Sequence, residues 1–120
     1  MRLVILESPF AGDVTRNVAY ARACMRDCLL RGDAPFASHL LYTQEGVLDD
    51  NIPEERELGI KAGFEWRGKA KATVVYTDLG YSNGMKYGIA DAMAKGRPIE
   101  YRTLPPEELA KLPPPKTNPS

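Results

Sequence analysis

Apolar and polar residues follow two different periods along this chain. Residues 2–6 form a short, almost wholly apolar run that a Ser-Pro pair closes, which predicts a strand covered on both faces. Residues 14–31 change to apolar positions three and four apart, which predicts an amphipathic helix that ends at Gly32. The apolar positions of this helix are Val18, Ala21, Cys24, Met25, Cys28 and Leu29.

The same two patterns continue through the rest of the chain. Further strands are predicted at residues 34–41, 72–77 and 97–101, the first of them restricted by Pro35. A helix is predicted from Pro53, with glutamates in its first turns, to residues 67–69, and another over residues 85–95. Polar residues 42–51 and the glycine-rich residues 78–84 are predicted to be loops.

Strands and helices therefore alternate, which predicts the α/β class. The expected fold is a flavodoxin- or Rossmann-like three-layer sandwich with a small parallel sheet of four or five strands. We expect one domain over residues 1–103. The proline-rich tail, residues 104–120, is predicted to carry one helical turn at residues 107–112 and then to be disordered.

Composition narrows the class of partner. The chain has 16 basic and 16 acidic residues, so nothing in its net charge favours nucleic acid or an anionic membrane surface. No apolar run approaches the roughly 18 residues of a membrane helix, and the first residues do not resemble a signal peptide. Cys24 and Cys28 share one helix face, as a core pair or a reactive pair. Two cysteines and one histidine argue against a zinc site, and we expect no cofactor and a cytoplasmic location.

Ligands of open parallel sheets bind beyond the carboxyl ends of the strands, where polar and small residues follow three of the predicted strands. We expect a small-molecule pocket there, with backbone amides at the starts of two helices converging on an anion. The candidate catalytic residues are Glu7, His39 and Asp78. The candidate ligand-binding residues are Ser8, Pro9, Phe10, Gly12, Asn17, Ser38, His39, Asp78, Ser82, Asn83, Gly84 and Met85.

Each candidate also has a purely structural interpretation. Asp78 and Ser82 could cap a turn and a helix, and His39 could be a core histidine. Asn17 could be solvated, because it faces away from the apolar stripe of its helix. Two further groups are interpreted as structural. An acidic group is expected to be solvated: Asp49, Asp50, Glu54 and Glu55. Two aromatic residues are expected in the core or an interface: Trp66 and Tyr87.

Neither glycine-rich loop carries the dinucleotide or the Walker motif, so hydride transfer and ATP hydrolysis are poorly supported. The motifs instead resemble the nucleoside 2-deoxyribosyltransferase-like superfamily, which includes deoxynucleoside monophosphate N-glycosidases, and in particular its small phage and bacterial members. Four segments in this order carry the resemblance: Leu6 to Gly12, Asn17, Ser38-His39, and Asp78 to Ala90. The resemblance implies a flavodoxin-like fold, a homodimer or higher homo-oligomer, and a glutamate nucleophile helped by a second acid.

The chain departs from that pattern at the nucleophile. The family places a glutamate in the first turn of the last helix, and the corresponding position here is Gly88. Glu65 is the nearest match by spacing for the second acid. Three hypotheses follow. In the first, the chain binds a nucleotide by its phosphate, catalyses no reaction and thereby sequesters a nucleotide signal. In the second, it cleaves or transfers N-glycosides with a relocated acid such as Glu7. In the third, it is an interaction module that acts through its dimer surface.

Overall fold

The computed structural model describes residues 1–116 and contains nine helices and strands within them. In chain order these are β1 (Arg2–Glu7), α1 (Val14–Leu30), β2 (Asp33–Phe36), α2 (Ser38–Leu41), α3 (Pro53–Arg67), β3 (Ala72–Tyr76), α4 (Asn83–Ala94), β4 (Ile99–Arg102) and α5 (Pro106–Leu109).

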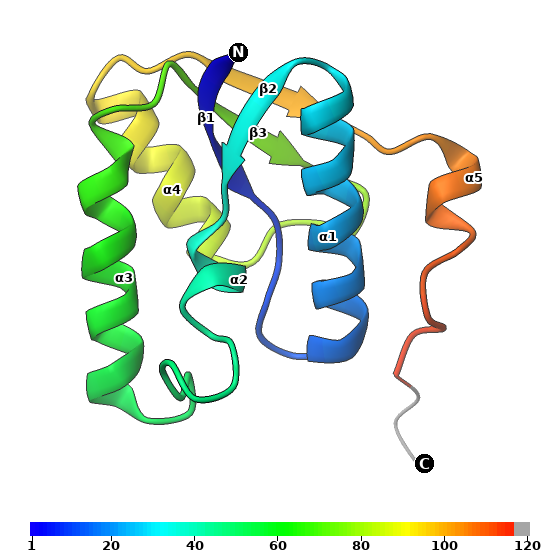
Figure 1. Ribbon diagram of the computed structural model, residues 1–120, viewed down its shortest axis with the longest axis horizontal. Helices are drawn as coiled ribbons and strands as arrows, with labels where there is room; N and C mark the ends of the chain where they lie inside the picture. Colours follow the sequence, from blue (N-terminus) through cyan, green and yellow to red (C-terminus); the bar gives the residue numbers. More distant parts are fainter. Residues whose placement is uncertain (117–120) are drawn as a thin grey trace.

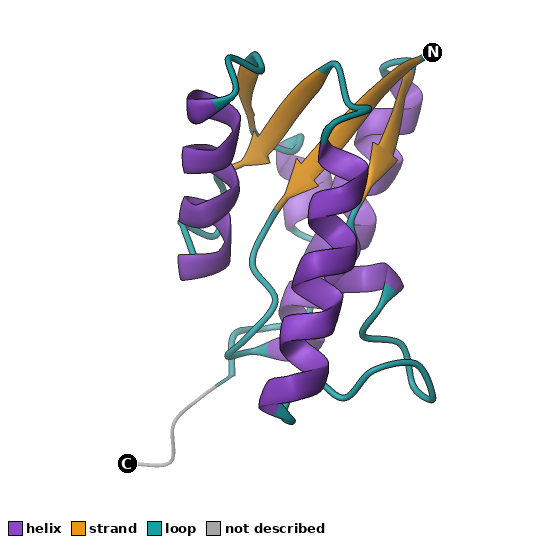
Figure 2. Cartoon of the chain, turned by 90° about the vertical axis from the view of Figure 1, so that its left-hand side faces the viewer, coloured by secondary structure: helices purple, strands orange, loops and turns teal. Residues whose placement is uncertain are grey.

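The four strands form one parallel sheet in the order β2-β1-β3-β4. Figure 2 shows all four arrows pointing toward the same end of the molecule. The sheet lies between α1 on one side and α3 with α4 on the other (Figure 1). The predicted three-layer α/β sandwich with a small parallel sheet is therefore confirmed.

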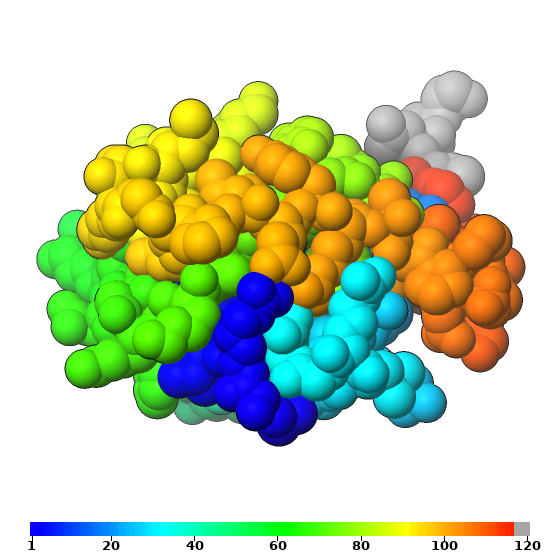
Figure 3. Space-filling model, turned by 90° about the horizontal axis from the view of Figure 1, so that it is seen from above, coloured from blue at the N-terminus to red at the C-terminus, as the bar shows by residue number. Residues whose placement is uncertain are grey.

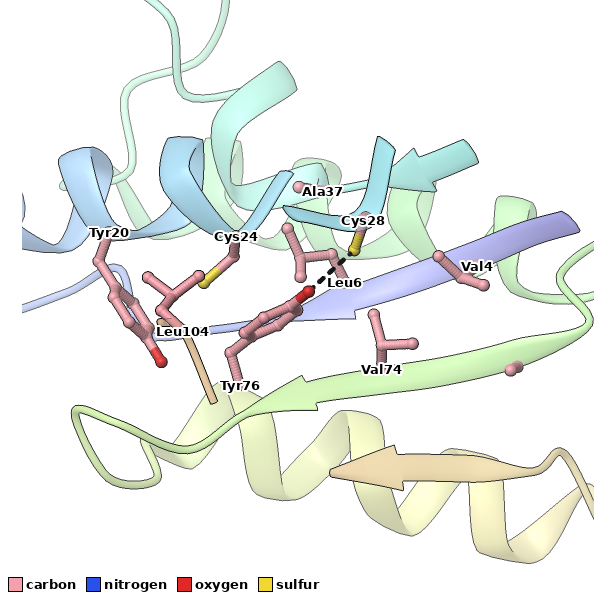
Figure 4. Packing of buried hydrophobic residues seen from close by; sticks show 10 residues of the cluster. Val4, Leu6, Tyr20, Cys24, Cys28, Ala37, Val74, Tyr76 and Leu104 are labelled. Atoms are coloured by element: carbon pink, nitrogen blue, oxygen red, sulfur yellow. Dashed lines mark hydrogen bonds between the residues drawn. The ribbon is translucent and has the colours of Figure 1, made fainter. Parts of the chain in front are cut away.

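The face of the sheet under α1 holds an apolar core. Alternate residues of β1 and β3 point to this face because side chains along a strand alternate. They pack against the inner side of α1, as Figure 4 shows. The buried members of this core are Val4, Leu6, Tyr20, Cys24, Cys28, Ala37, Ala72, Val74, Tyr76 and Leu104. Cys24 and Cys28 are both free and buried, as expected for a core pair.

The opposite face of the sheet holds buried charge as well as apolar groups. Ile5 and Val75 are buried here beside the Glu7 carboxylate. The residues that α4 buries are Met85, Gly88 and Ala92. Helix α3 buries only Gly63 and Arg67 of its 15 residues, so few buried groups hold this helix in place.

The second strand is shorter than predicted. Strand β2 ends at Phe36, and the predicted strand residues Ser38 to Leu41 instead form the helical turn α2, where the Leu40 amide bonds the Ala37 carbonyl. The pair Leu40-Leu41 suggested a strand because a short apolar run does not distinguish strand from helix. The aromatic prediction was wrong for the core, because the exposed fractions of Trp66 and Tyr87 are 52% and 74%. A role in an interface stays a prediction.

The C-terminal segment packs beside α1 (Figure 1). Leu104 is buried in the core, and Leu109 and Leu112 pack against it. Arg16 of α1 donates to the Pro113 carbonyl, and the Lys116 amide donates to Asp13. The predicted helical turn is present as α5. Disorder was predicted beyond residue 112. Part of that segment, residues 117–120, lies outside the described residues. A domain boundary at residue 103 stays a prediction.

A network of four charges joins β4 to the end of the sheet where β1 and β2 begin. In Figure 3, which views this end, the first residues of β1, the start of β2 and β4 lie side by side. Arg2 bonds both Asp33 and Glu100, and Arg102 bonds the same two carboxylates. Each guanidinium therefore meets two carboxylates. Among residues 1–116, no helix is long and apolar enough to cross a membrane.

Candidate functional site

Glu7 ends β1 as a buried carboxylate. Its side chain and that of Arg67 are each 9% exposed, and Arg67 Nη2 donates to Glu7 Oε1 at 3.2 Å. The second oxygen, Oε2, and two nitrogens of Arg67, Nε and Nη1, are buried without a hydrogen-bond partner. Burial raises the pKa of Glu7 to about 7, against the opposing effect of Arg67. The pair is therefore a buried ion pair with unused bonding capacity on both partners.

The Glu7 carboxylate occupies the space that a side chain at Gly88 would fill. A Cβ placed on Gly88 would overlap the carboxylate of Glu7, so only glycine at this position of α4 leaves room for it. The sequence-based resemblance assigns the family's glutamate to the position of Gly88, and this correspondence stays a prediction. In three dimensions a carboxylate from β1 stands at that position.

Charges from two further elements surround this carboxylate. Asp91 of α4 raises the pKa of Glu7 and Arg97 lowers it, both at a distance. Asp91 itself pairs with Arg97 at 3.3 Å and with Lys95 at 2.9 Å. The guanidinium of Arg67 lies 4.7 Å from the centre of the Phe64 ring. The Phe64 ring contacts Arg67 from one side. The pairing with Glu7 is the one ion pair of Arg67 among the described residues.

Ser8 and His39 form a second polar pair beside Glu7. Ser8 is buried, and its Oγ lies 2.7 Å from His39 Nε2. Burial lowers the pKa of His39 to about 4, so the imidazole is neutral near pH 7 and can accept the Ser8 proton. The Thr43 hydroxyl donates to the His39 carbonyl. Ser38, the neighbour of His39, packs closely on α3, since a Cβ on Gly63 would lie 2.9 Å from Ser38 Cβ.

A pocket of about 690 Å³ opens between the loop after β1 and the loop that precedes α3. Of the predicted ligand-binding residues, Phe10 and Gly12 line it. Its other wall contains four acidic side chains and no basic one: Glu45, Asp49, Asp50 and Glu55. Of these, Asp49, Asp50 and Glu55 were interpreted from the sequence as solvated. A negative wall repels an anion, so this pocket is poorly matched to a phosphate.

Asn17 holds the first pocket wall in place. It is buried, and its Nδ2 donates to the carbonyls of Phe10 and Ala11 at 3.0 and 3.1 Å. The solvated interpretation of Asn17 was therefore wrong. The side chain lies outside the apolar stripe of α1 and bonds the loop. Helical periodicity does not reveal this role. Pro9, in the same loop, is also buried.

The predicted residues of the third loop serve the fold. Asp78 Oδ2 accepts bonds from the Tyr20 hydroxyl and the Leu104 amide, at 2.7 and 3.0 Å. Ser82 caps α4, with its Oγ accepting from the amide of the buried Met85. Asn83 and Gly84 are exposed. None of the residues from 78 to 85 lines the large pocket.

The two helix starts also do not share this pocket. Helices α1 and α4 cover opposite faces of the sheet (Figure 1), and Gly12 and Val14 line the pocket at the start of α1 alone. The start of α1 is capped by the Asp13 carboxylate, which accepts from the Arg16 amide. This carboxylate already supplies the negative charge that the helix dipole favours. The expected convergence of both helix starts on one anion is absent from the described pocket.

Sequence reasoning missed Arg67 and the acidic wall. Arg67 was noted only as the residue that ends a helix, and no periodic signal marks its approach to Glu7, 60 residues away. The acidic residues were noted, but a charged run on a loop gives no sign that it faces a pocket. The one clue to Arg67 in the sequence was Glu7 itself, because a carboxylate that ends an apolar strand needs a buried partner.

Comparison with solved structures finds the same fold in a 2-deoxyribosyltransferase from the psychrotolerant bacterium Bacillus psychrosaccharolyticus. The TM-score is 0.60 at 20% sequence identity, over 84% of this chain and 72% of that one. The expected fold relationship is confirmed, while membership of the glycosidase group stays a prediction. No curated protein sequence matches the chain. A family model matches residues 2–102, and the chain therefore belongs to the family described as "Domain of unknown function (DUF7768)".

Proposed function

We propose that this protein breaks the N-glycosidic bond of a nucleoside, with the Glu7 carboxylate as the group that attacks the sugar. The observation that carries the proposal is the place of this carboxylate, which fills the side-chain space of Gly88. In the family that the sequence resembles, a glutamate at this helix position is the nucleophile. The shared fold of the Bacillus psychrosaccharolyticus 2-deoxyribosyltransferase supports the same chemistry here.

The reaction proceeds by two displacements at the anomeric carbon. A Glu7 oxygen forms a bond to C1′ as the bond from C1′ to the base nitrogen breaks, and the base leaves with that electron pair and takes up a proton from water. A water molecule then attacks C1′, loses a proton to solvent and releases Glu7 as a carboxylate. With a second base in place of water, the same intermediate gives transfer instead of hydrolysis.

The ionisation of Glu7 sets the pH dependence of this step. Only the carboxylate attacks, and the pKa of Glu7 is raised to about 7 by burial. The first displacement therefore accelerates as the pH rises through about 7 and then levels. Arg67 opposes the effect of burial, because its positive charge favours the ionised form.

The pocket wall favours a nucleoside over a nucleotide. Four carboxylates and no basic side chain line the pocket, so a 5′-phosphate would meet repulsion without a counter-charge. This changes the sequence-based expectation of a ligand held by its phosphate. The apolar lining from Phe10, Val14 and Val47 suits the face of a base.

A second candidate function is nucleoside binding without turnover. It is favoured by the burial of Glu7, which is 8% exposed and does not line the pocket. In that case the Glu7–Arg67 pair holds β1 to α3, and the pocket alone takes the ligand.

Base release separates the two candidates. The protein is incubated with nucleosides and with their 5′-monophosphates, and free base is followed by chromatography. We expect release from nucleosides that Glu7→Gln abolishes and that Glu57→Gln leaves intact. Glu57 is the matched control because its side chain is 68% exposed on α3. Nucleosides that raise the melting temperature without releasing base would support binding alone. No release and no shift with any nucleoside would overturn both candidates.

A further inference from the structure

Three buried polar atoms of the Glu7–Arg67 pair have no hydrogen-bond partner within residues 1–116. They are Glu7 Oε2, Arg67 Nε and Arg67 Nη1. Both side chains are nine-tenths buried, so bulk water does not satisfy these atoms. Buried polar atoms in folded proteins almost always have partners, and exceptions call for an explanation.

A second, partly exposed arginine cluster shows what a structural network looks like. Arg2 and Arg102 each bond the same two carboxylates, Asp33 and Glu100. Arg67 has one carboxylate and uses one nitrogen for it. A network that only holds the fold together has no need of two spare donors and a spare acceptor. The Glu7–Arg67 pair has the unused bonding capacity of a site that awaits a ligand.

We infer that Arg67 binds the 2′-hydroxyl of the sugar, so that this protein selects ribonucleosides over 2′-deoxynucleosides. The inference rests on the proposed attack of Glu7 on C1′. With Oε1 held by Arg67, the free oxygen Oε2 is the one available to attack. The 2′-hydroxyl is bonded to the carbon next to C1′, so it lies closest to the guanidinium that holds the attacking carboxylate.

The chemistry of the spare atoms matches a hydroxyl group. Guanidinium N–H groups donate, and a hydroxyl oxygen has two lone pairs to accept them. In retaining glycoside hydrolysis, hydrogen bonds to the 2-hydroxyl strengthen in the transition state. A site built to bond a substrate hydroxyl discriminates strongly against the analogue without it, because its own buried groups stay unpaired. A phosphate in place of the hydroxyl conflicts with the acidic wall of the pocket of about 690 Å³.

Access to the pair requires a movement of its cover. Helix α3 carries Arg67 and buries only Gly63 besides it, while Leu58, Ile60 and Trp66 on the same helix are about half exposed. The cover is therefore attached by few buried groups.

The test compares sugars that differ by one hydroxyl. Adenosine, guanosine, cytidine and uridine are each compared with the 2′-deoxy counterpart, and 3′-deoxyadenosine controls for the position of the hydroxyl. We expect kcat/KM for base release to favour the ribonucleoside by about 100-fold or more, with 3′-deoxyadenosine close to adenosine. In Arg67→Met this ratio falls to near 1. In the matched control Arg56→Met, an exposed arginine of the same helix, the ratio is unchanged.

The outcomes separate this inference from the proposed function. Release from 2′-deoxynucleosides as fast as from ribonucleosides overturns the role of Arg67 and leaves the glycosidase proposal standing. If no nucleoside is cleaved, the melting shift decides: a larger shift with ribonucleosides supports the hydroxyl contact, and equal shifts overturn it. No cleavage and no shift overturn both. The wild-type sugar series needs no variant, so the inference stays falsifiable if Arg67→Met does not fold.

Discussion

Glu7 and Asp78 follow the carboxyl ends of two paired strands, β1 and β3, and the sequence gives no reason to treat them differently. Asp78 points to the α1 face, where Tyr20 and the Leu104 amide both donate to one of its oxygens. The Asp78 amide also donates to the Tyr20 hydroxyl, at 3.0 Å. Glu7 points to the α3 and α4 face, where one oxygen bonds Arg67 and the other has no partner.

The comparison extends to the two faces of the sheet. Under α1 the polar groups are paired, as in the bond from the Tyr76 hydroxyl to Asp27 at 2.6 Å, and the rest is apolar. Under α3 and α4 a glycine makes room for the Glu7 carboxylate, one oxygen of which has no partner among the described residues. Fully bonded polar groups stabilise a fold, whereas local violations of this rule tend to mark functional sites. The face with the less satisfied groups is therefore where we expect chemistry.

The largest expected effect concerns the structural carboxylate. Asp78→Ala leaves the Tyr20 hydroxyl and the Leu104 amide without their acceptor. We expect a loss of roughly 2–4 kcal/mol in the free energy of unfolding, since each unsatisfied buried group costs about 1–3 kcal/mol. Urea denaturation measures it. Glu7→Gln, measured in parallel, should cost less than about 1 kcal/mol. A larger loss in Glu7→Gln than in Asp78→Ala would contradict the division into a structural and a functional carboxylate.

The second prediction tests the space that Glu7 fills. Gly88→Ala puts a methyl group onto the Glu7 carboxylate, and we expect about 1–3 kcal/mol of destabilisation by overpacking. Gly84→Ala on the same helix is the control, because its Cβ would meet only Ser82 Oγ, at 3.9 Å. In the Glu7→Ala background the cost of Gly88→Ala should largely disappear. If the cost persists there, Glu7 is not what fills the space.

The third prediction concerns the loop that forms the pocket wall. Asn17→Ala removes both bonds to the Phe10 and Ala11 carbonyls, so the wall beside Gly12 loses its anchor. We expect nucleoside binding to weaken about 5- to 10-fold, which calorimetric titration measures, with about 1 kcal/mol lost in stability. Unchanged affinity would mean that the ligand does not use this wall.

The last prediction concerns the dependence of stability on pH. The pKa of Glu7 is raised from 4.5 to about 7 by burial, so between these values the unfolded chain has lost a proton that the folded chain keeps. The contribution of Glu7 to stability is therefore full below pH 4.5 and is lost as the pH rises to about 7. The difference in unfolding free energy between wild type and Glu7→Gln isolates this change, since His39, with its pKa lowered to about 4, acts in the opposite direction in both proteins.

Glu100 supplies the contrasting case. Arg2 and Arg102 lower the pKa of Glu100 to about 2, so its contribution is present above pH 4.5 and is lost as the pH falls. The difference in unfolding free energy between wild type and Glu100→Gln should therefore stay constant above pH 4.5 and shrink as the pH falls below it. If wild type loses stability relative to Glu7→Gln as the pH falls, then the ion pair with Arg67, and not burial, determines the pKa of Glu7.

Local patterns predicted the fold well and the site only in part. The alternating strands and helices, and Glu7 at a strand end, follow from periods that neighbouring residues define. The turn at Ser38 to Leu41 was missed because four residues carry too little pattern. The approach of Glu7 to Gly88 joins residues 81 positions apart, and neither residue signals the other. Asn17 and Arg67 are similar, since their partners lie in other elements and tertiary packing alone brings them together.

Moving the carboxylate back to the helix shows whether Glu7 takes the place of a helix glutamate. Glu7→Ala should abolish base release from nucleosides. The double variant Glu7→Ala with Gly88→Glu should restore it in part, because a side chain from α4 then reaches the space that Glu7 left. A double variant that folds and binds nucleosides as tightly as the wild type, yet releases no base, would contradict the account.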